Sequence, residues 1–158
     1  MRTLLLVFFF LFIASIVSAE PKPQADNKDF CNGYLDLSAK LQCSSSNYLT
    51  QFGYRYCRTF EEQQMYFTPH GQKVLEGLRV CLLSSLQKSV NSCDAVESVA
   101  YPSHVDCYVK EGFCEMDPTD QMQILWIVRA EISNPEFQST SAKVAQACAA
   151  VGTAAPSR

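Results

Sequence analysis

Residues 68–86 read TPHGQKVLEGLRVCLLSSL and carry the clearest helix signal in the chain. Thr68 is a good N-cap, and Pro69 suits the first helical position because its φ angle is already fixed. Beyond Pro69, apolar residues recur at steps of three and four, which is the spacing of one helix face. They are Val74, Leu75, Leu78, Cys81, Leu82 and Leu86. We therefore predict a long helix here, with one face in a core.

Two more helices are predicted N-terminal to this segment, because both carry apolar residues at helical spacing. In residues 29–41 these are Phe30, Tyr34, Leu37 and Leu41. In residues 48–60 they are Leu49, Phe52, Tyr56 and Phe60. Gly53 is the weak point of the second helix, since glycine disfavours a helix interior. Residues 64–67 are the one candidate for a strand.

Further helices are predicted C-terminal to it. We expect a short helix over 94–99 and another over 102–111, which Gly112 ends. The cap-and-proline pattern recurs at Asp117–Pro118 and Asn134–Pro135, and the last helix should run to Ala149. The stripe expected after Pro118 is Met122, Leu125, Val128, Arg129 and Ile132, broadened by Ile124 and Ile127. The predicted fold is all-α, a single disulfide-stapled domain of about five to seven helices.

The first nineteen residues have the features of a secretory signal peptide. Arg2 precedes an apolar run over 4–17, and small residues at 17–19 predict cleavage before Glu20. The alternative, an uncleaved membrane anchor, is disfavoured because the run is short for a bilayer. We expect a secreted, extracellular protein with no membrane span after cleavage. It would comprise a disordered leader at 20–28, a helical domain at 29–150 and a flexible tail at 151–158.

The charge balance argues against a nucleic-acid partner. The chain has 13 Lys and Arg residues against 16 Asp and Glu, a net charge of −3. Cleavage of the signal peptide removes Arg2 and no acidic residue, which makes the mature chain slightly more acidic. Nucleic-acid binding needs clustered basic residues, which this sequence does not offer.

Eight cysteines follow the signal peptide, and an even number in an oxidising compartment predicts four disulfides. They are Cys31, Cys43, Cys57, Cys81, Cys93, Cys107, Cys114 and Cys148. A zinc site would need close pairs such as Cys-x-x-Cys, whereas the nearest two cysteines here are seven positions apart. We therefore expect no metal site, and no free thiol that could act as a nucleophile.

The cysteine pattern resembles that of the stanniocalcin family. Cys57-Arg58-Thr59-Phe60, then Phe67 through Lys73, then Cys81 are similar to a family element of Cys-x-x-Phe, Phe-x-x-x-Gly-x-Lys and a helix with a cysteine. The separations 57 to 81, 107 to 114 and 114 to 148 are like the family's to within a residue. The resemblance covers Cys31 to Cys148, about three quarters of the chain.

The resemblance implies a disulfide map and a mode of action. It implies the pairs Cys31–Cys43, Cys81–Cys107 and Cys114–Cys148, and it leaves Cys57 and Cys93 without their family partners, so that these two are expected to pair. It also implies a hormone-like signalling factor, or a regulator of a secreted protease, that acts on an extracellular protein or receptor. The family's cysteine that joins two chains is absent, so we expect a monomer.

No enzyme motif is complete, so we predict a protein that is not an enzyme and uses no cofactor. Residues 103–108, SHVDCY, have a weak similarity to the His-Asp-x-Cys-Tyr helix of secreted phospholipases. Asp106 is displaced by one position, however, and no glycine-rich calcium loop is present. We expect His104 to be a surface residue in a first helical turn, and His70 to be exposed at a helix start.

Three acidic side chains and one tryptophan are further candidate sites. A calcium loop needs oxygen ligands at alternating positions, and the acidic residues Glu115, Asp117 and Asp120 do not provide them. We expect these residues to lie at a helix N-terminus, where their negative charge interacts favourably with the helix dipole. Trp126 is expected in the core; outside the apolar arc it would become a candidate for partner contact. No partner-binding residue is otherwise assigned.

Three hypotheses for the function follow. The first is a stanniocalcin-like factor that acts through protein contact. The second is a secreted lipid-binding helical protein of the saposin type, which an apolar cavity would favour. The third is a phospholipase-like hydrolase, which the missing calcium loop disfavours.

Overall fold

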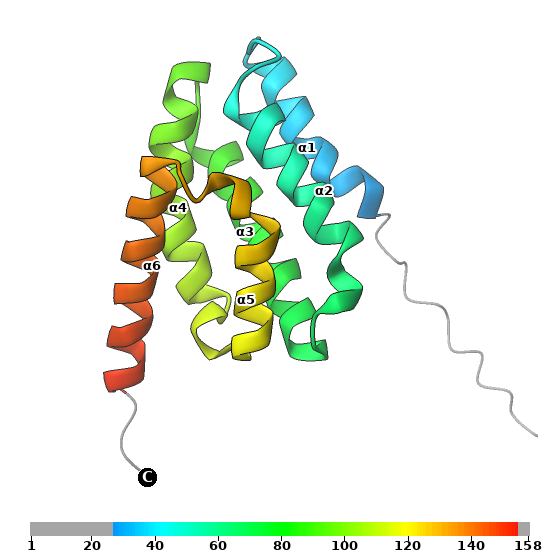
Figure 1. Cartoon of the computed structure of the whole chain (residues 1–158). Helices are drawn as coiled ribbons and strands as arrows, with labels where there is room; N and C mark the ends of the chain where they lie inside the picture. The colour runs from blue at the N-terminus through cyan, green and yellow to red at the C-terminus, as the bar shows by residue number, and fades with distance from the viewer. Residues whose placement is uncertain (1–26, 155–158) are drawn as a thin grey trace, which may run out of the picture.

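The computed structural model describes residues 27–154, which form six α-helices joined by short helical segments (Figure 1). The α-helices are α1 (Asn27–Lys40), α2 (Arg55–Glu62), α3 (Pro69–Ser89), α4 (Val96–Lys110), α5 (Pro118–Ile127) and α6 (Pro135–Ala154). The linking segments are a π-helix, η1 (Leu49–Tyr54), and the 3₁₀ turns η2 (Gln64–Tyr66), η3 (Cys93–Ala95), η4 (Phe113–Glu115) and η5 (Arg129–Glu131). The described chain contains no strand, so the all-α prediction is confirmed. None of its helices is long and apolar enough to cross a membrane.

The three predicted cap-and-proline helix starts are confirmed. The Thr68 hydroxyl accepts a hydrogen bond from the Gly71 amide at 3.1 Å, and α3 begins at Pro69. Asp117 accepts from the Thr119 amide at 2.8 Å at the start of α5. The Asn134 side chain caps α6 in the same way, accepting from the backbone amide of Glu136. In each case the side-chain oxygen satisfies an amide that has no partner within the helix.

Asp120 joins the N-terminal ends of α3 and α5. Its carboxylate accepts hydrogen bonds from the Thr68 amide at 3.0 Å and the Thr68 hydroxyl at 2.5 Å, and only 2% of Asp120 is exposed. Gly71 makes room for this contact, because a Cβ atom there would collide with the Asp120 carboxylate. Asp120 lies in the first turn of α5, at the helix N-terminus predicted for it, and its buried carboxylate has a structural role there.

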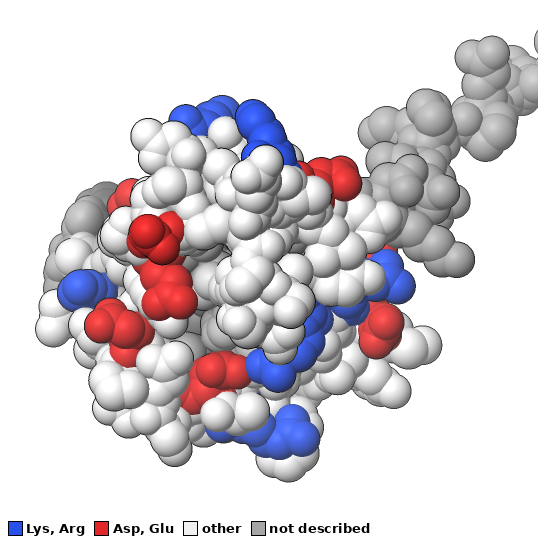
Figure 2. Space-filling view, turned by 90° about the horizontal axis from the view of Figure 1, so that it is seen from above, with Lys and Arg blue, Asp and Glu red and all other residues white. Residues whose placement is uncertain are grey.

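The core consists of two apolar clusters along α3. One gathers α1, η1, the C-terminal half of α3 and the start of α4. The other gathers the N-terminal half of α3 with α5 and the C-terminal half of α4. On the upper face of the molecule, acidic and basic side chains are interspersed among uncharged surface (Figure 2).

Two of the four predicted disulfides are confirmed and two are wrong. Cys81–Cys107 and Cys114–Cys148 form as expected. The other four cysteines pair as Cys31–Cys57 and Cys43–Cys93, in place of Cys31–Cys43 and Cys57–Cys93. The resemblance to the stanniocalcin pattern therefore fails over the first cysteines.

Helix geometry explains the correction. Cys31 lies in the second turn of α1 and Cys43 follows its end, and the helix from Cys31 to Lys40 alone spans about 14 Å. Disulfide-bonded Cα atoms lie within about 7 Å. Because α1 and α2 run side by side (Figure 1), Cys57 is within reach of Cys31, with their Cα atoms 5.7 Å apart. Closed loops of 26 and 50 residues should each contribute about 3–4 kcal/mol in the chain-entropy model.

Several predicted boundaries differ from those observed. The helices expected over 94–99 and 102–111 form the single helix α4, with Pro102 inside it. Proline removes one helical hydrogen bond there, but Pro102 and Ser98 are both exposed, so water can satisfy the Ser98 carbonyl. The strand candidate at 64–67 is largely the 3₁₀ turn η2.

The ends of the chain also differ from expectation where they are described. Helix α1 starts at Asn27, inside the predicted leader, and α6 runs to Ala154, inside the predicted tail. The predicted signal peptide, residues 20–26 of the leader and residues 155–158 of the tail lie outside the described residues.

Replacing Asp120 with alanine should destabilise the fold strongly. The change removes two hydrogen bonds to a charged group and leaves the Thr68 amide unpaired, at a cost of about 2–4 kcal/mol. Urea unfolding followed by circular dichroism would measure this. Asp117→Ala, which removes an exposed cap only, should cost about 1 kcal/mol. Equal losses in the two variants would contradict the role assigned to Asp120.

Candidate functional site

A cavity of about 620 Å³ lies among η1 and the helices α1 to α6. Its lining is mostly apolar, and Arg79 is the only charged side chain among the described residues that line it. Phe52, Tyr56 and Phe60, predicted as the apolar stripe of one helix, form part of its wall from η1 and α2. That stripe therefore faces a hollow as well as packed neighbours.

Aromatic rings in contact form much of the wall. Tyr48 stacks on Phe52 with ring centroids 4.9 Å apart, and Phe52 meets the edge of Tyr56 at 4.8 Å. On α4, the His104 ring lies 6.0 Å from Tyr108, which contacts Phe113 at 4.8 Å. Rings that pack on one another hold a fixed shape, so the wall does not depend on a ligand for its geometry.

The mouth of the cavity lies between α5 and α6. Met122 and Leu125 of α5 line the cavity while being 63% and 42% exposed. From α6, Ala145 is also exposed and lines the cavity. Helix α6 packs chiefly against α4, and the Cys114–Cys148 disulfide fixes it to η4. The two helices thus flank an opening through which an apolar molecule can reach the interior.

His104 lies inside the protein and lines the cavity, so the predicted surface position is wrong. It stands in the middle of α4, because the helix begins at Val96 and not at Pro102. Its Nδ1 atom is 2.7 Å from the Ala100 carbonyl oxygen. Burial lowers the pKa of His104 below its usual value, so the ring is neutral at pH 7.

Tyrosine hydroxyls supply most other polar groups of the cavity. Burial raises the pKa of Tyr108 to about 12 and also raises the pKa of Tyr34 and Tyr48. All three therefore remain protonated at physiological pH. Gly53 of η1 allows α1 to come close, since a Cβ atom there would collide with the Tyr34 ring. This contact fixes one side of the cavity.

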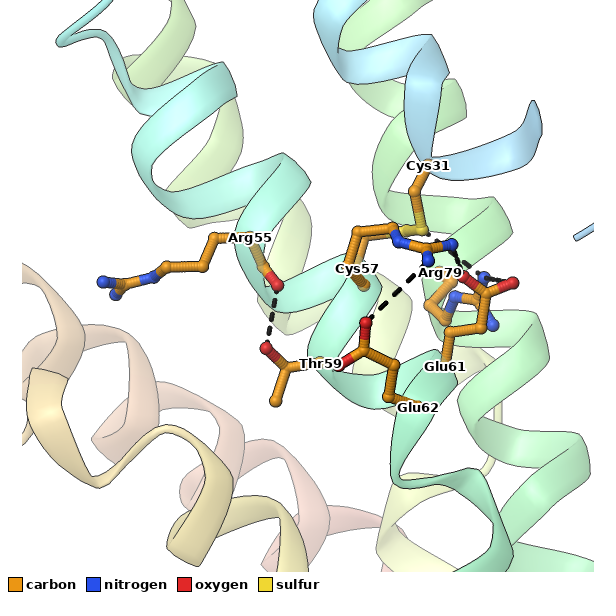
Figure 3. Close-up of polar contacts among 8 residues, drawn as sticks. Cys31, Arg55, Cys57, Thr59, Glu61, Glu62 and Arg79 are labelled. Carbon is orange, nitrogen blue, oxygen red and sulfur yellow. Dashed lines mark hydrogen bonds and ion pairs between the residues drawn. A yellow bond between two sulfur atoms is a disulfide. The ribbon is translucent and has the colours of Figure 1, made fainter. Parts of the chain in front are cut away.

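Arg79 of α3 is held beside the Cys31–Cys57 disulfide (Figure 3). Its guanidinium lies 3.7 Å from the Glu61 carboxylate, which also binds Arg58. Burial lowers the pKa of Arg79, opposed by Glu61, but arginine keeps its charge in proteins. Its Nε atom is the one fully buried side-chain nitrogen or oxygen without a partner in residues 27–154. The positive charge is thus compensated from α2 and not from the cavity.

The other residues singled out from the sequence lie apart from the cavity. His70 is exposed at the start of α3, as predicted. Asp117 caps α5, and the Thr119 hydroxyl and amide lower its pKa. Asp106 is exposed and makes no contact with His104, whose Nδ1 faces a carbonyl. Within the described residues, no group of three or more His, Cys, Asp or Glu side chains could hold a metal ion.

The exposed side of α5 differs from the predicted one. Trp126 is 62% exposed, so the expectation that it belongs to the core is wrong. Asp120, Ile124 and Ile127 occupy the inward face, and Trp126 falls on the opposite side of the helix. Met122 and Leu125 of the predicted stripe are exposed within α5, and Ile132, beyond the end of α5, is 54% exposed, so the predicted stripe does not match the buried face.

Comparison with protein-family models, with curated proteins and with solved structures finds no match.

The buried His104 should make stability fall as the pH is lowered. Its pKa is depressed in the folded state, so below about pH 6.5 the unfolded chain binds more protons than the folded one, and protonation favours unfolding. Urea midpoints should therefore drop between pH 7.5 and pH 5.0. His104→Phe should reduce that drop, whereas His70→Phe should not. Identical pH profiles for His104→Phe and the unmodified chain would contradict the buried neutral state.

Proposed function

We propose that this protein is a secreted carrier that binds a small lipid or similar apolar molecule in the cavity. The cavity itself supports this most directly. Protein interiors normally pack with few voids larger than a water molecule, whereas ligand sites measure about 300–1,000 Å³. The cavity, at about 620 Å³, lies in this range, and its lining of aromatic and aliphatic side chains with one charged residue distinguishes it from two surface hollows of about 530 and 550 Å³ that several charged residues line. This is the lipid-binding hypothesis drawn from the sequence, without any requirement for saposin-like cysteine clustering.

The shape and chemistry of the site favour binding over catalysis. A histidine general base in a hydrolase works with a nucleophile or a carboxylate that lies in the same site. The described lining holds no Asp or Glu side chain and no free thiol beside His104, and its wall is largely aromatic. Binding of an apolar ligand against such a wall removes apolar surface from water, which favours binding by about 25 cal/mol per Å² buried. The exposed apolar side chains at the mouth lower the cost of moving a lipid from a membrane or micelle into the cavity.

The cavity hypothesis predicts that blocking the mouth abolishes binding. Ala145→Trp places a large side chain at an exposed position that lines the cavity, and should lower the affinity for the neutral probe N-phenyl-1-naphthylamine by about tenfold or more. Ala142→Trp, at an exposed position of α6 outside the lining, is the matched control and should bind like the unmodified chain. Fluorescence titration would measure both.

Two results would contradict the carrier hypothesis. One is the absence of saturable probe binding to the unmodified, fully oxidised protein. The other is equal weakening by the Ala145 and Ala142 substitutions, since this would place the bound probe on the surface of α6 and not in the cavity.

Action through protein contact, as implied by the stanniocalcin resemblance, is the second candidate, and the exposure of Trp126 favours it. The Arg129 guanidinium lies 4.2 Å above the Trp126 ring and holds it in place. A preordered exposed tryptophan is typical of interface hot spots. The partner would be an extracellular protein or receptor.

A partner captured from the secreted material of the source tissue should be lost when Trp126 is replaced by alanine. The loss expected for a hot-spot tryptophan is about 2 kcal/mol or more, roughly thirtyfold in affinity. Tyr66→Ala, which truncates another exposed aromatic outside α5, is the control. Retention of the partner by Trp126→Ala would contradict this second candidate and leave the carrier hypothesis unaffected.

A further inference from the structure

The ionisation and tautomer of His104 define what its free nitrogen can do. Nδ1 lies 2.7 Å from the Ala100 carbonyl oxygen, and a carbonyl can only accept a hydrogen bond. Nδ1 therefore carries the proton. In a neutral imidazole the other nitrogen, Nε2, is then a hydrogen-bond acceptor. The group that it can recognise must be a donor.

The ring of His104 lines the cavity, and its free nitrogen, Nε2, is accessible. No described residue donates to Nε2, and the only fully buried side-chain nitrogen or oxygen without a partner in the described chain is Nε of Arg79. Nε2 consequently keeps accessible surface. His104 is enclosed by protein, but its side chain keeps some solvent-accessible surface. It also lines the cavity. The accessible side of the ring is thus the side that a bound molecule would meet.

Three tyrosine hydroxyls lie around the same space. Tyr34, Tyr48 and Tyr108 line the cavity, and their hydroxyls make no hydrogen bond with any residue between 27 and 154. They lie close enough to affect one another's ionisation. Each hydroxyl can donate and accept. Together with Nε2 they supply uncharged donors and acceptors in a site whose lining is mostly apolar.

The cavity offers little to an anionic head group. Its described lining contains no lysine, and the guanidinium of Arg79 is drawn toward Glu61 with its Nε closed off. Burying a carboxylate without a cation or several donors is costly. A neutral head that both donates and accepts matches the histidine and the tyrosines better.

We infer that the preferred ligand is an apolar molecule with one neutral hydroxyl group, such as a long-chain alcohol, whose O–H donates to Nε2 of His104. The inference rests on the proposed carrier function. The tyrosine hydroxyls, Tyr108 foremost because its ring adjoins His104, donate to the ligand oxygen. His104 is then the residue that determines specificity for the head group.

The test is displacement of N-phenyl-1-naphthylamine at pH 7.5 by three ligands of equal chain length: 1-dodecanol, its methyl ether and dodecanoate. The unmodified, fully oxidised protein should bind the alcohol about tenfold or more tightly than either of the other two, as expected for a site whose acceptor is left unpaired by an analogue. In His104→Phe, the affinities for the alcohol and the ether should differ by no more than about twofold. His70→Phe is the matched control and should keep the preference.

Each outcome decides the inference. Equal binding of alcohol and ether by the unmodified chain, tighter binding of dodecanoate, or an unchanged preference in His104→Phe would overturn it, while displacement of the probe would leave the carrier function standing. Failure of all three ligands to displace the probe would overturn both. If His104→Phe does not fold, Tyr108→Phe provides the test instead. Loss of its hydroxyl should lower the affinity for 1-dodecanol by about threefold to tenfold and leave the circular dichroism spectrum unchanged.

Discussion

The Cys114–Cys148 disulfide is the constraint on which the cavity depends. It fixes the C-terminal half of α6 to η4, at the end of α4, while α6 packs along α4. Helix α5 is fixed independently, through the bond between Asp120 and Thr68 at the start of α3. Both helices are thus anchored outside the cavity, and Met122, Leu125 and Ala145, which they contribute to its lining, remain exposed at its edge.

An open apolar cavity reduces stability, because its lining atoms lose packing partners. The fold offsets this with four disulfides, each of which restricts the unfolded chain. Cys57 and Cys148 contribute to the cavity lining themselves, so covalent bonds hold two parts of the wall. Stabilisation by crosslinks leaves the interior free to be shaped for a ligand, where a small domain without them would need that space for core side chains.

Much of the helical framework could be predicted from local signals. Thr68–Pro69, Asp117–Pro118 and Asn134–Pro135 mark helix starts because the capping bond and the fixed proline angle act within a few residues. Pro102 is a local signal that misled, since it does not break α4 and lies on its exposed side. The helix predicted over 29–41 conflicts with the Cys31–Cys43 pair that the resemblance implied, since a helix between the two cysteines holds their sulfurs apart, and the pair predicted from the resemblance was wrong.

The candidate site could not be predicted in the same way. The spacing of Phe52, Tyr56 and Phe60 identifies an inward face but cannot tell a packed core from a cavity wall. The environment of His104 depends on α6 and on aromatic residues far away in sequence, and Trp126 is exposed because Asp120 and Ile127 set the inward face of α5. These features arise from tertiary packing, for which a single sequence carries no periodic signal.

The central claim, that the cavity holds an apolar chain, is tested most directly by nuclear Overhauser contacts between bound 1-dodecanol and the protein's methyl groups. The account predicts contacts that saturate at one ligand per chain and involve Leu82, Val128 and Val144, which line the cavity. Leu37 and Val90, buried in the core outside the lining, should show none. Contacts confined to exposed methyls such as those of Val80 and Val151, or no saturable contacts, would contradict it.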